Sequence, residues 1–202
     1  VFVHPDGSIF ILYVDDFMLV ASAKNASIHW KELASAVEFS EEAAPILRYL
    51  GAIYGLDDYD VKFPRNPRTL MVDMTDYVLN LVKRFELDWG KPVPNVSSPF
   101  VAEVDGKGVD EETGRFQESC SSYVATVLFA ARVCRADCST AVQRLCTQVS
   151  RWTVADDAAL IRLMGYLKHQ ANLGLTGTLG PDDLLDLELR VWTDADWNGN
   201  PN

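Results

Sequence analysis

The sequence predicts an α+β fold in which strands come first, helices follow, and strands return near the end of the chain. Continuous apolar runs separated by short polar pairs occupy the start of the sequence. Between 118 and 169 the apolar residues instead recur at helical spacing. Short apolar runs then return at 173–179 and 187–193. Because strands and helices fall in separate blocks and do not alternate along the chain, a parallel α/β sheet is not expected.

The first element is a β-hairpin. Two apolar runs, 8–14 and 17–21, flank the pair Asp15-Asp16. Two short runs joined by two polar residues predict a hairpin, and their lack of alternation predicts burial on both faces. Asp-Asp is a poor choice for a two-residue turn, and burying unpaired carboxylates is costly unless a cation compensates. The pair therefore indicates either a divalent-metal site or an exposed acidic turn.

The next elements are two helices separated by strands. The pattern from 27 to 38 is helical. The residues available to face a core there are Ile28, Leu33 and Val37. Apolar segments at 47–56 and 69–72 predict strands. Thr75 is the expected N-cap of a helix that ends at Gly90. Its expected inner face consists of Tyr77, Val78, Leu81, Val82 and Phe85.

The second half of the chain is predicted to be mainly helical. Residues 91–117 are rich in Pro, Gly, Ser and acids and indicate a loop. Three helices are expected after it, near 118–135, 138–152 and 155–169, and their short joints predict an antiparallel bundle. The strands at 173–179 and 187–193 would be separated by a turn at Gly180-Pro181-Asp182-Asp183.

The four cysteines lie within the helical stripes and contain no C-x-x-C pair. They are expected to be small hydrophobic residues of a reduced core, which indicates an intracellular compartment. The alternative is a zinc site, whose spacing would fit no common pattern. That alternative would use Cys134, Cys138, Cys146 and His169. The sequence suggests no partner for His4 or His29.

Composition argues for an ordered chain. Apolar residues make up 48% of the 202, and the mean hydropathy is near zero. No apolar run approaches the roughly 20 residues of a membrane helix, and no secretory signal is visible, so no membrane partner is expected. The chain begins without Met and ends soon after a strand-like segment. We therefore expect it to be a piece of a longer protein.

The net charge of −11 would by itself argue against a nucleic-acid partner. The distribution of charge removes that objection. Residues 61–100 carry 6 basic and 4 acidic side chains, and residues 119–179 carry 6 and 3. Arg144, Gln148 and Arg151 share one polar helix face that could follow a phosphate backbone, although a solvated face is the other interpretation. With only 18 basic residues in total, any binding should be weak and salt-sensitive.

Seven segments in order resemble the reverse transcriptase of copia-type retrotransposon polyproteins. Tyr13-Val14-Asp15-Asp16 is similar to the YxDD box of this family. The segment ending Leu47-Arg48-Tyr49-Leu50-Gly51-Ala52-Ile53 resembles the part that closes the palm and contributes to the primer grip. The further matches are Met74 to Phe85, Val96-Ser97-Ser98-Pro99, Tyr123 to Asp137, Gly165 to Leu175, and Trp192 to Gly199, the last resembling the start of the family's RNase H domain.

The resemblance implies a role for each matching residue. Asp15 and Asp16 would be two of the three polymerase carboxylates, holding Mg²⁺ or Mn²⁺ opposite the primer 3′-hydroxyl and the incoming dNTP. Tyr13 would lie beside the primer end, with Val14 as the variable box position. Tyr49, Leu50 and Gly51 would hold the primer backbone, or else form plain sheet core. Asp194 would be the first metal ligand of RNase H, whereas Asp196 could equally be a solvated turn acid.

The resemblance also implies three segments and their limits. Residues 1–72 would be the rear of the polymerase palm, 73–172 a helical thumb and connection, and 173–202 the first strands of an RNase H-like domain. In this family the third polymerase carboxylate, the fingers and further RNase H acids lie outside the matched region. The chain alone is therefore expected neither to polymerise nor to cleave.

The implied partners are an RNA or DNA template-primer, dNTP and the rest of the polyprotein, in the cytoplasm, virus-like particles or nucleus. Ala136 stands where the family usually has Pro, which leaves open a diverged copy. The alternative is a non-catalytic relic that binds nucleic acid or protein. A third interpretation is an unrelated metal-dependent phosphohydrolase. It is disfavoured because this sequence does not contain the motifs that such enzymes carry.

Overall fold

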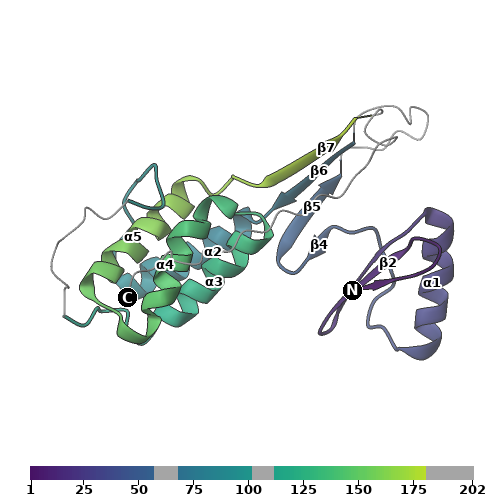
Figure 1. Cartoon of the computed structure of the whole chain (residues 1–202), viewed down its shortest axis with the longest axis horizontal. Coiled ribbons are helices and arrows are strands. Elements are labelled where there is room, and N and C mark those ends of the chain that lie inside the picture. Colours follow the sequence, from purple (N-terminus) through teal and green to yellow (C-terminus); the bar gives the residue numbers. More distant parts are fainter. Residues whose placement is uncertain (57–67, 102–111, 181–202) are drawn as a thin grey trace, which may run out of the picture.

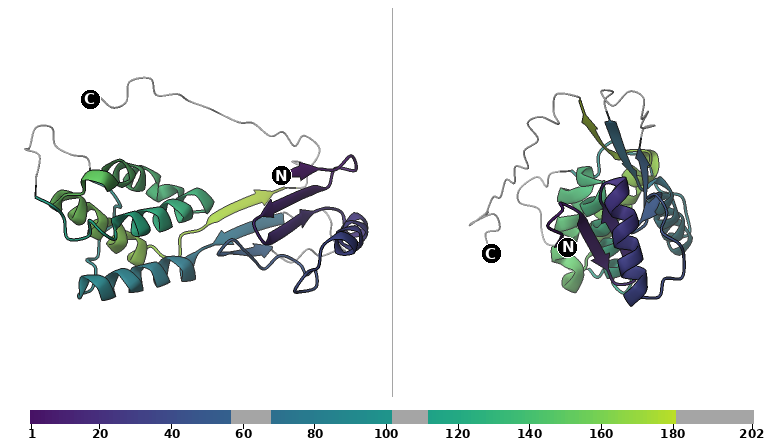
Figure 2. Two further views of the ribbon diagram at one scale, coloured as in Figure 1. Left: turned by 90° about the horizontal axis from the view of Figure 1, so that it is seen from below. Right: turned by 90° about the vertical axis from the view of Figure 1, so that its right-hand side faces the viewer.

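The computed structural model describes residues 1–56, 68–101 and 112–180 and shows an α+β protein (Figure 1). Within this part the chain forms two small antiparallel sheets and five α-helices. Figures 1 and 2 show an elongated arrangement, with the first sheet and its helix at one end and the helical region at the other. The α+β class expected from the sequence is confirmed.

The first sheet is a three-stranded meander in the order β1-β2-β3. It consists of β1 (Phe2–Val3), β2 (Ile9–Tyr13) and β3 (Asp16–Val20). The predicted hairpin is present as β2 and β3, but the prediction of burial on both faces is wrong, because every residue of the two strands is half-buried or exposed. The described elements cover only one face of this sheet.

The covering element is α1 (Ala23–Ala36). Trp30 lies edge-on to Phe10 of β2 and to Phe39, with ring centroids 6.4 and 5.7 Å apart. Phe17 of β3 contacts Phe39 from the other side at 5.2 Å. The sheet and the helix are therefore joined by a chain of aromatic rings, none of which is fully buried.

The bounds and inner face of α1 differ from the prediction. The helix begins earlier than residue 27, because the Ser22 hydroxyl accepts the Asn25 backbone N–H and caps it. Ile28 and Val37, expected to face a core, are 45% and 41% exposed, and only Leu33 is half-buried. The half-buried face follows the spacing of Ala26, His29, Trp30 and Leu33.

The second sheet has the order β4-β5-β6-β7. Its strands are β4 (Arg48–Tyr49), β5 (Ala52–Leu56), β6 (Arg68–Asp73) and β7 (Leu175–Leu179). The single strand predicted over 47–56 is instead a hairpin, because Leu50 and Gly51 both have positive φ and turn the chain. The strand predicted at 69–72 is confirmed as part of β6.

β7 pairs along the length of β6, with Val72 opposite Leu175 and Arg68 opposite Leu179. All the helices after α1 lie in the sequence between these two neighbouring strands. The strand expected at 173–179 is thus present, and it extends the sheet formed by 48–73. The proposed division of the chain at 72/73 and 172/173 remains a prediction, and the strand expected at 187–193 lies outside the described residues.

α2 (Thr75–Trp89) is the helix predicted after β6, and it ends at Gly90 as expected. Thr75 is not its N-cap but its first residue. The Asp73 carboxylate accepts the Thr75 backbone N–H at 2.5 Å, and the Thr75 hydroxyl donates to the Ala171 carbonyl at 3.1 Å. The expected inner face is largely confirmed: Val78, Leu81, Val82 and Phe85 are buried, while Tyr77 is half-buried.

The three predicted bundle helices are confirmed with short 3-10 segments at two joints. They are α3 (Cys120–Val133), η1 (Ala136–Cys138), α4 (Ser139–Gln148), η2 (Val149–Arg151) and α5 (Val154–His169). A capping box begins α5: the Thr153 side chain accepts the N–H of Asp156, whose carboxylate accepts the N–H of Thr153. Helices α2 to α5 enclose the main hydrophobic core.

The cysteines are free, and Cys120, Cys134 and Cys138 belong to this core, whereas Cys146 is half-buried. Burial raises the pKa of the Cys138 thiol to about 12, so it stays protonated at neutral pH. Among the described residues no cysteine takes part in a group with metal-ligand geometry. The alternative zinc site is therefore not formed.

Two acids, the buried Asp157 and the solvent-exposed Asp137, accept hydrogen bonds from buried donors of the helical region. Asp157 accepts the Arg115 N–H at 2.5 Å, the Phe116 N–H at 3.2 Å and the Trp152 indole N–H at 2.7 Å. Asp137 accepts two bonds from the fully buried Arg135, from Nε at 3.0 Å and Nη2 at 2.8 Å. These contacts satisfy donors that would otherwise destabilise the core.

One structural finding bears on the expectation of no membrane partner. In residues 1–56, 68–101 and 112–180, none of the helices combines the length and the apolar character needed to cross a bilayer.

Candidate functional site

The tip of the β2–β3 hairpin carries the candidate carboxylates. Tyr13 pairs with Asp16, so the two-residue turn consists of Val14 and Asp15, not of Asp15 and Asp16 as the sequence suggested. Asp16 is the first residue of β3. All four residues of this tip are exposed. The two carboxylates therefore stand at the end of the ribbon, open to solvent, and the expected burial of their charge is not found.

The turn requires an unusual backbone. Val14 has φ of 53°, in the left-handed region that β-branched residues rarely occupy. Such conformations cost of order 1–3 kcal/mol and persist only where the surrounding structure imposes them. Here the register of the hairpin imposes it, because two-residue hairpin turns favour positive φ at their central residues.

The β4–β5 hairpin has a second two-residue turn that begins with a non-glycine residue at positive φ. Tyr49 pairs with Ala52, and the turn residues Leu50 and Gly51 have φ of 48° and 76°. A Cβ at Gly51 would lie 3.3 Å from the Tyr77 ring, so glycine permits both the turn and its contact with α2. Among the described residues, Val14 and Leu50 are the two non-glycine residues with positive φ.

The charge of Asp16, in the first hairpin, affects the pKa of Tyr49, in the second. Burial raises the pKa of the Tyr49 hydroxyl, and the negative charge of Asp16 raises it further, followed by Tyr54. Tyr49 is 8% exposed, and its hydroxyl oxygen has no hydrogen-bond partner among the described residues. Asp16 and Tyr49 belong to different sheets, so this effect links the first hairpin to the second.

A cavity of about 130 Å³ lies beside the second turn. Gly51 and Arg48 line it from the hairpin, and Asp76 and Tyr77 line it from the first turns of α2. The Arg48 guanidinium and the Asp76 carboxylate are 4.0 Å apart and largely exposed, so this ion pair contributes little to stability. The cavity has room for a few water molecules or a small polar group next to the turn.

The polar helix face predicted from the sequence is present on α4 and η2. Arg151 Nε donates to Gln148 Oε1 at 3.0 Å, and the Arg144 guanidinium lies 4.7 Å from the Phe100 ring centroid. Arg144 and Arg151 are exposed, and Gln148 is half-buried. The three side chains lie one above the other at helical spacing. Figure 1 shows α4 within the helical region, away from the β2–β3 hairpin.

Two candidates cannot be placed. Asp194 and Asp196, predicted at the start of an RNase H-like site, lie outside the described residues. The assignment of Asp194 as a metal ligand stays a prediction, and so does the choice between a ligand and a solvated turn acid for Asp196.

One group of potential metal ligands was missed by sequence reasoning. His4, Asp6 and His29 meet between the β1–β2 loop and α1 and have metal-ligand geometry. The available signal was the spacing His4-Pro5-Asp6, which puts two potential ligands on one tight turn. The third ligand could not be found this way, because only the packing of α1 on the sheet brings His29 to them.

Comparison with protein-family models, with curated proteins and with solved structures finds no match to this chain.

Proposed function

We propose that this chain is part of an RNA-directed DNA polymerase of a copia-type retrotransposon, with Asp15 and Asp16 as metal-binding catalytic residues. The observation that carries the proposal is the pair of strained turns. Val14 and Leu50 lie in the two segments that resemble the YxDD box and the primer grip, and strained backbone tends to cluster at functional sites. In this proposal both turns serve one site, and the effect of the Asp16 charge on the pKa of Tyr49 is in keeping with it.

The chemistry of the tip fits divalent-metal binding. Exposed, adjacent carboxylates supply the hard oxygen ligands that Mg²⁺ and Mn²⁺ prefer, and they leave positions for substrate phosphates. The bound ions would neutralise charge during transfer of a nucleotidyl group to a primer 3′-hydroxyl. Asp15 and Asp16 would hold the ions, and Tyr13, 55% exposed beside them, would contact the primer end.

The second turn would position the primer. Gly51 and the half-buried Leu50 present backbone at the surface beside the cavity, and the buried Tyr49 side chain anchors that backbone. In this reaction, positioning of the two reactants accounts for much of the rate. The basic face of Arg144, Gln148 and Arg151 would contact the nucleic-acid backbone farther from the reacting atoms.

The finer division into palm, thumb and RNase H start belongs to the same proposal. The hairpins and β6 would form the rear of the palm, and α2 to α5 the thumb. In the family, a third carboxylate completes the polymerase site from a preceding strand, so residues 1–202 alone are expected to bind a primer-template weakly and not to extend it. The alternative is a non-catalytic relic that retains binding.

The test is dNTP incorporation on a primed RNA template with Mg²⁺, using the polypeptide encoded by the full reading frame around these residues. Asp15→Asn and Asp16→Asn should each reduce incorporation to background, because each removes a metal ligand. Glu118→Gln, which removes an exposed acid at the start of the helical bundle, is the matched control and should leave the rate unchanged.

The outcomes separate the proposal from its alternative. Incorporation that survives both aspartate substitutions would overturn the assignment of the carboxylates. Salt-sensitive primer-template binding by the full polypeptide without incorporation would support the relic. Extension by residues 1–202 alone, above the level of Asp15→Asn, would contradict the requirement for a third carboxylate.

A further inference from the structure

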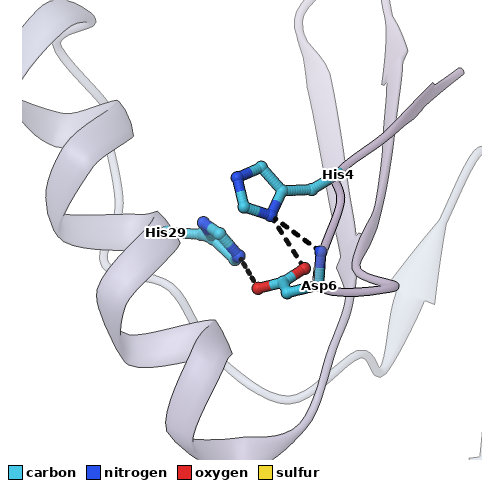
Figure 3. A group of neighbouring side chains, drawn as sticks. All are labelled: His4, Asp6 and His29. Carbon is cyan, nitrogen blue, oxygen red and sulfur yellow. Dashed lines mark hydrogen bonds and ion pairs between the residues drawn. The ribbon is translucent and has the colours of Figure 1, made fainter.

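A second group of potential metal ligands lies on residues 1–47, which comprise the first sheet and α1 and are called the N-terminal unit below, outside the site proposed above. Figure 3 shows His4 and Asp6 on the β1–β2 loop and His29 on α1, with their polar atoms directed toward one another. The His29 Nε2 atom is 2.8 Å from Asp6 Oδ2, and the His4 Nδ1 atom is 2.9 Å from Asp6 Oδ1. The ligand atoms of all three side chains lie within 4.8 Å of one another.

Two contacts of His4 with Asp6 indicate where a cation would bind in this group. Its Nδ1 atom accepts the Asp6 backbone N–H at 3.3 Å, a role that requires a lone pair on that nitrogen. The same atom faces the Asp6 carboxylate at 2.9 Å, so two electron-rich atoms oppose each other. Either a proton or a metal ion between them relieves this repulsion.

Two further contacts hold the ligands in place. The Ser8 backbone N–H donates to Asp6 Oδ1 at 2.8 Å, and this bond is the main reason that the pKa of Asp6 lies below its ordinary value. The other ring nitrogen of His29, Nδ1, lies 3.5 Å from Glu32 Oε2. A carboxylate behind a histidine ligand commonly fixes its ring orientation and tautomer.

We propose that His4 Nδ1, Asp6 and His29 Nε2 form a binding site for one Zn²⁺ ion, with Glu32 as a positioning residue for His29. Two imidazoles and one carboxylate are a usual zinc ligand set that leaves a fourth position open. Imidazole ligands also favour zinc over Mg²⁺, so the site is chemically distinct from the carboxylate pair on the β2–β3 hairpin.

A cavity of about 330 Å³ adjoins the cluster between the first sheet and α1. His4 and His29 lie on its wall together with apolar side chains such as Phe10 and Leu33. The Ser8 hydroxyl also lines it, 3% exposed and with no partner among the described residues. The cavity gives space for the water molecule that would complete the coordination of the ion, and Ser8 offers that water a hydrogen-bond partner.

The test measures Zn²⁺ and Co²⁺ binding to residues 1–202 by calorimetry and by the visible absorption of bound Co²⁺. We expect one ion per chain. His4→Gln and His29→Gln should each weaken binding about 100-fold, and Glu32→Gln about tenfold, in the range seen for groups around metal sites. His4→Gln is the sharper variant, because its side chain is 55% exposed and its loss should not affect folding.

His169→Gln is the matched control, since His169 is exposed on the last turn of α5, and it should leave the affinity unchanged. Asp15→Asn should also leave Zn²⁺ binding unchanged, which separates this site from the proposed polymerase site. Three results would overturn the proposal: no binding by the unmodified chain, equal affinity of His4→Gln and His169→Gln, or a thiolate-to-cobalt charge-transfer band. Circular dichroism confirms that each variant is folded.

Discussion

The helical region and the N-terminal unit use apolar residues in opposite ways. Helices α2 to α5 surround one core, and Phe85, Val127 and Leu163 have no exposed surface. Among residues 1–47 only Ser8 is buried, although β2 and β3 are as apolar as any segment of the chain. The difference shows that apolar sequence predicts burial only where several elements can surround it. One helix on one face of a small sheet leaves the other face open.

The aromatic clusters of the two regions show the same contrast. Phe85 contacts Phe116 and Tyr123 at centroid distances of 4.9 and 5.2 Å, inside the core. Phe17 contacts Phe10 and Phe39 at 5.6 and 5.2 Å, but its ring remains partly exposed. Similar ring geometry therefore accompanies very different burial, and burial is the larger contribution to stability.

The first prediction tests this contrast directly. Phe85→Ala should lower the free energy of unfolding by about 3–5 kcal/mol, because it leaves a cavity in a closed core. Phe17→Ala should lower it by about 1 kcal/mol, because much of the ring is already in contact with water. Urea unfolding followed by tryptophan fluorescence measures both. Equal losses would contradict the description of the N-terminal unit as open on one face.

The second prediction concerns the ion pair between the fully buried Arg135 and Asp137 in the helical region. The ion pairs of the N-terminal unit involve an exposed and a half-buried histidine instead. Asp137→Asn should destabilise the protein by about 3 kcal/mol, because Arg135 is fully buried and would lose its charged partner. Asp156→Asn removes only the capping-box acid of α5 and should cost about 1 kcal/mol.

The pH dependence of stability gives an independent readout of the same pair. Burial acts to raise the pKa of Asp137, but hydrogen bonds from Arg135 and Tyr166 outweigh it, and the pKa lies below its ordinary value. The stabilisation is therefore present above the ordinary pKa, about 4, and is lost as the pH falls through the lower folded-state value. Unfolding measured from pH 6 to pH 2 should show less of this acid-induced loss in Asp137→Asn.

The third prediction concerns the turn that lies between the two regions. Gly51→Ala should destabilise by about 1–2 kcal/mol, because φ is positive and the new Cβ would press on the Tyr77 ring of α2. Gly177→Ala in β7 is the control: a Cβ there meets open space, so its effect should be neutral or slightly stabilising. The same thermal unfolding change in both variants would show that the Leu50-Gly51 turn is not formed in solution.

Sequence patterns predicted the helical region well. Apolar spacing located α2 to α5 and the buried face of α2, because a closed bundle obeys the helical period along its whole length. The sheets were predicted less well. The apolar run over 47–56 did not reveal the turn at Leu50, because leucine carries no preference for positive φ.

The candidate site was predicted from sequence only in part. The Tyr13 to Asp16 segment identified a hairpin tip, but its exposure depends on what covers the sheet. The effect of the Asp16 charge on the pKa of Tyr49 depends on how separate elements pack, and so does the contact between His29 and Asp6. Local patterns contain no information on such contacts, whereas His4 and Asp6, only two positions apart in the sequence, could be recognised together.

The interruption of the second sheet by the helices has a consequence for the order of folding. β6 and β7 are neighbours in space, and the entropy lost in closing so long a loop would oppose their direct pairing in an unfolded chain. The Thr75 hydroxyl already meets the Ala171 carbonyl, 96 residues away in sequence, once α2 and α5 have packed. Folding of the bundle thus brings the two strands close together before they pair. We therefore expect β6 and β7 to pair last, with hydrogen bonds forming first at Val72 and Leu175 and then along the strands.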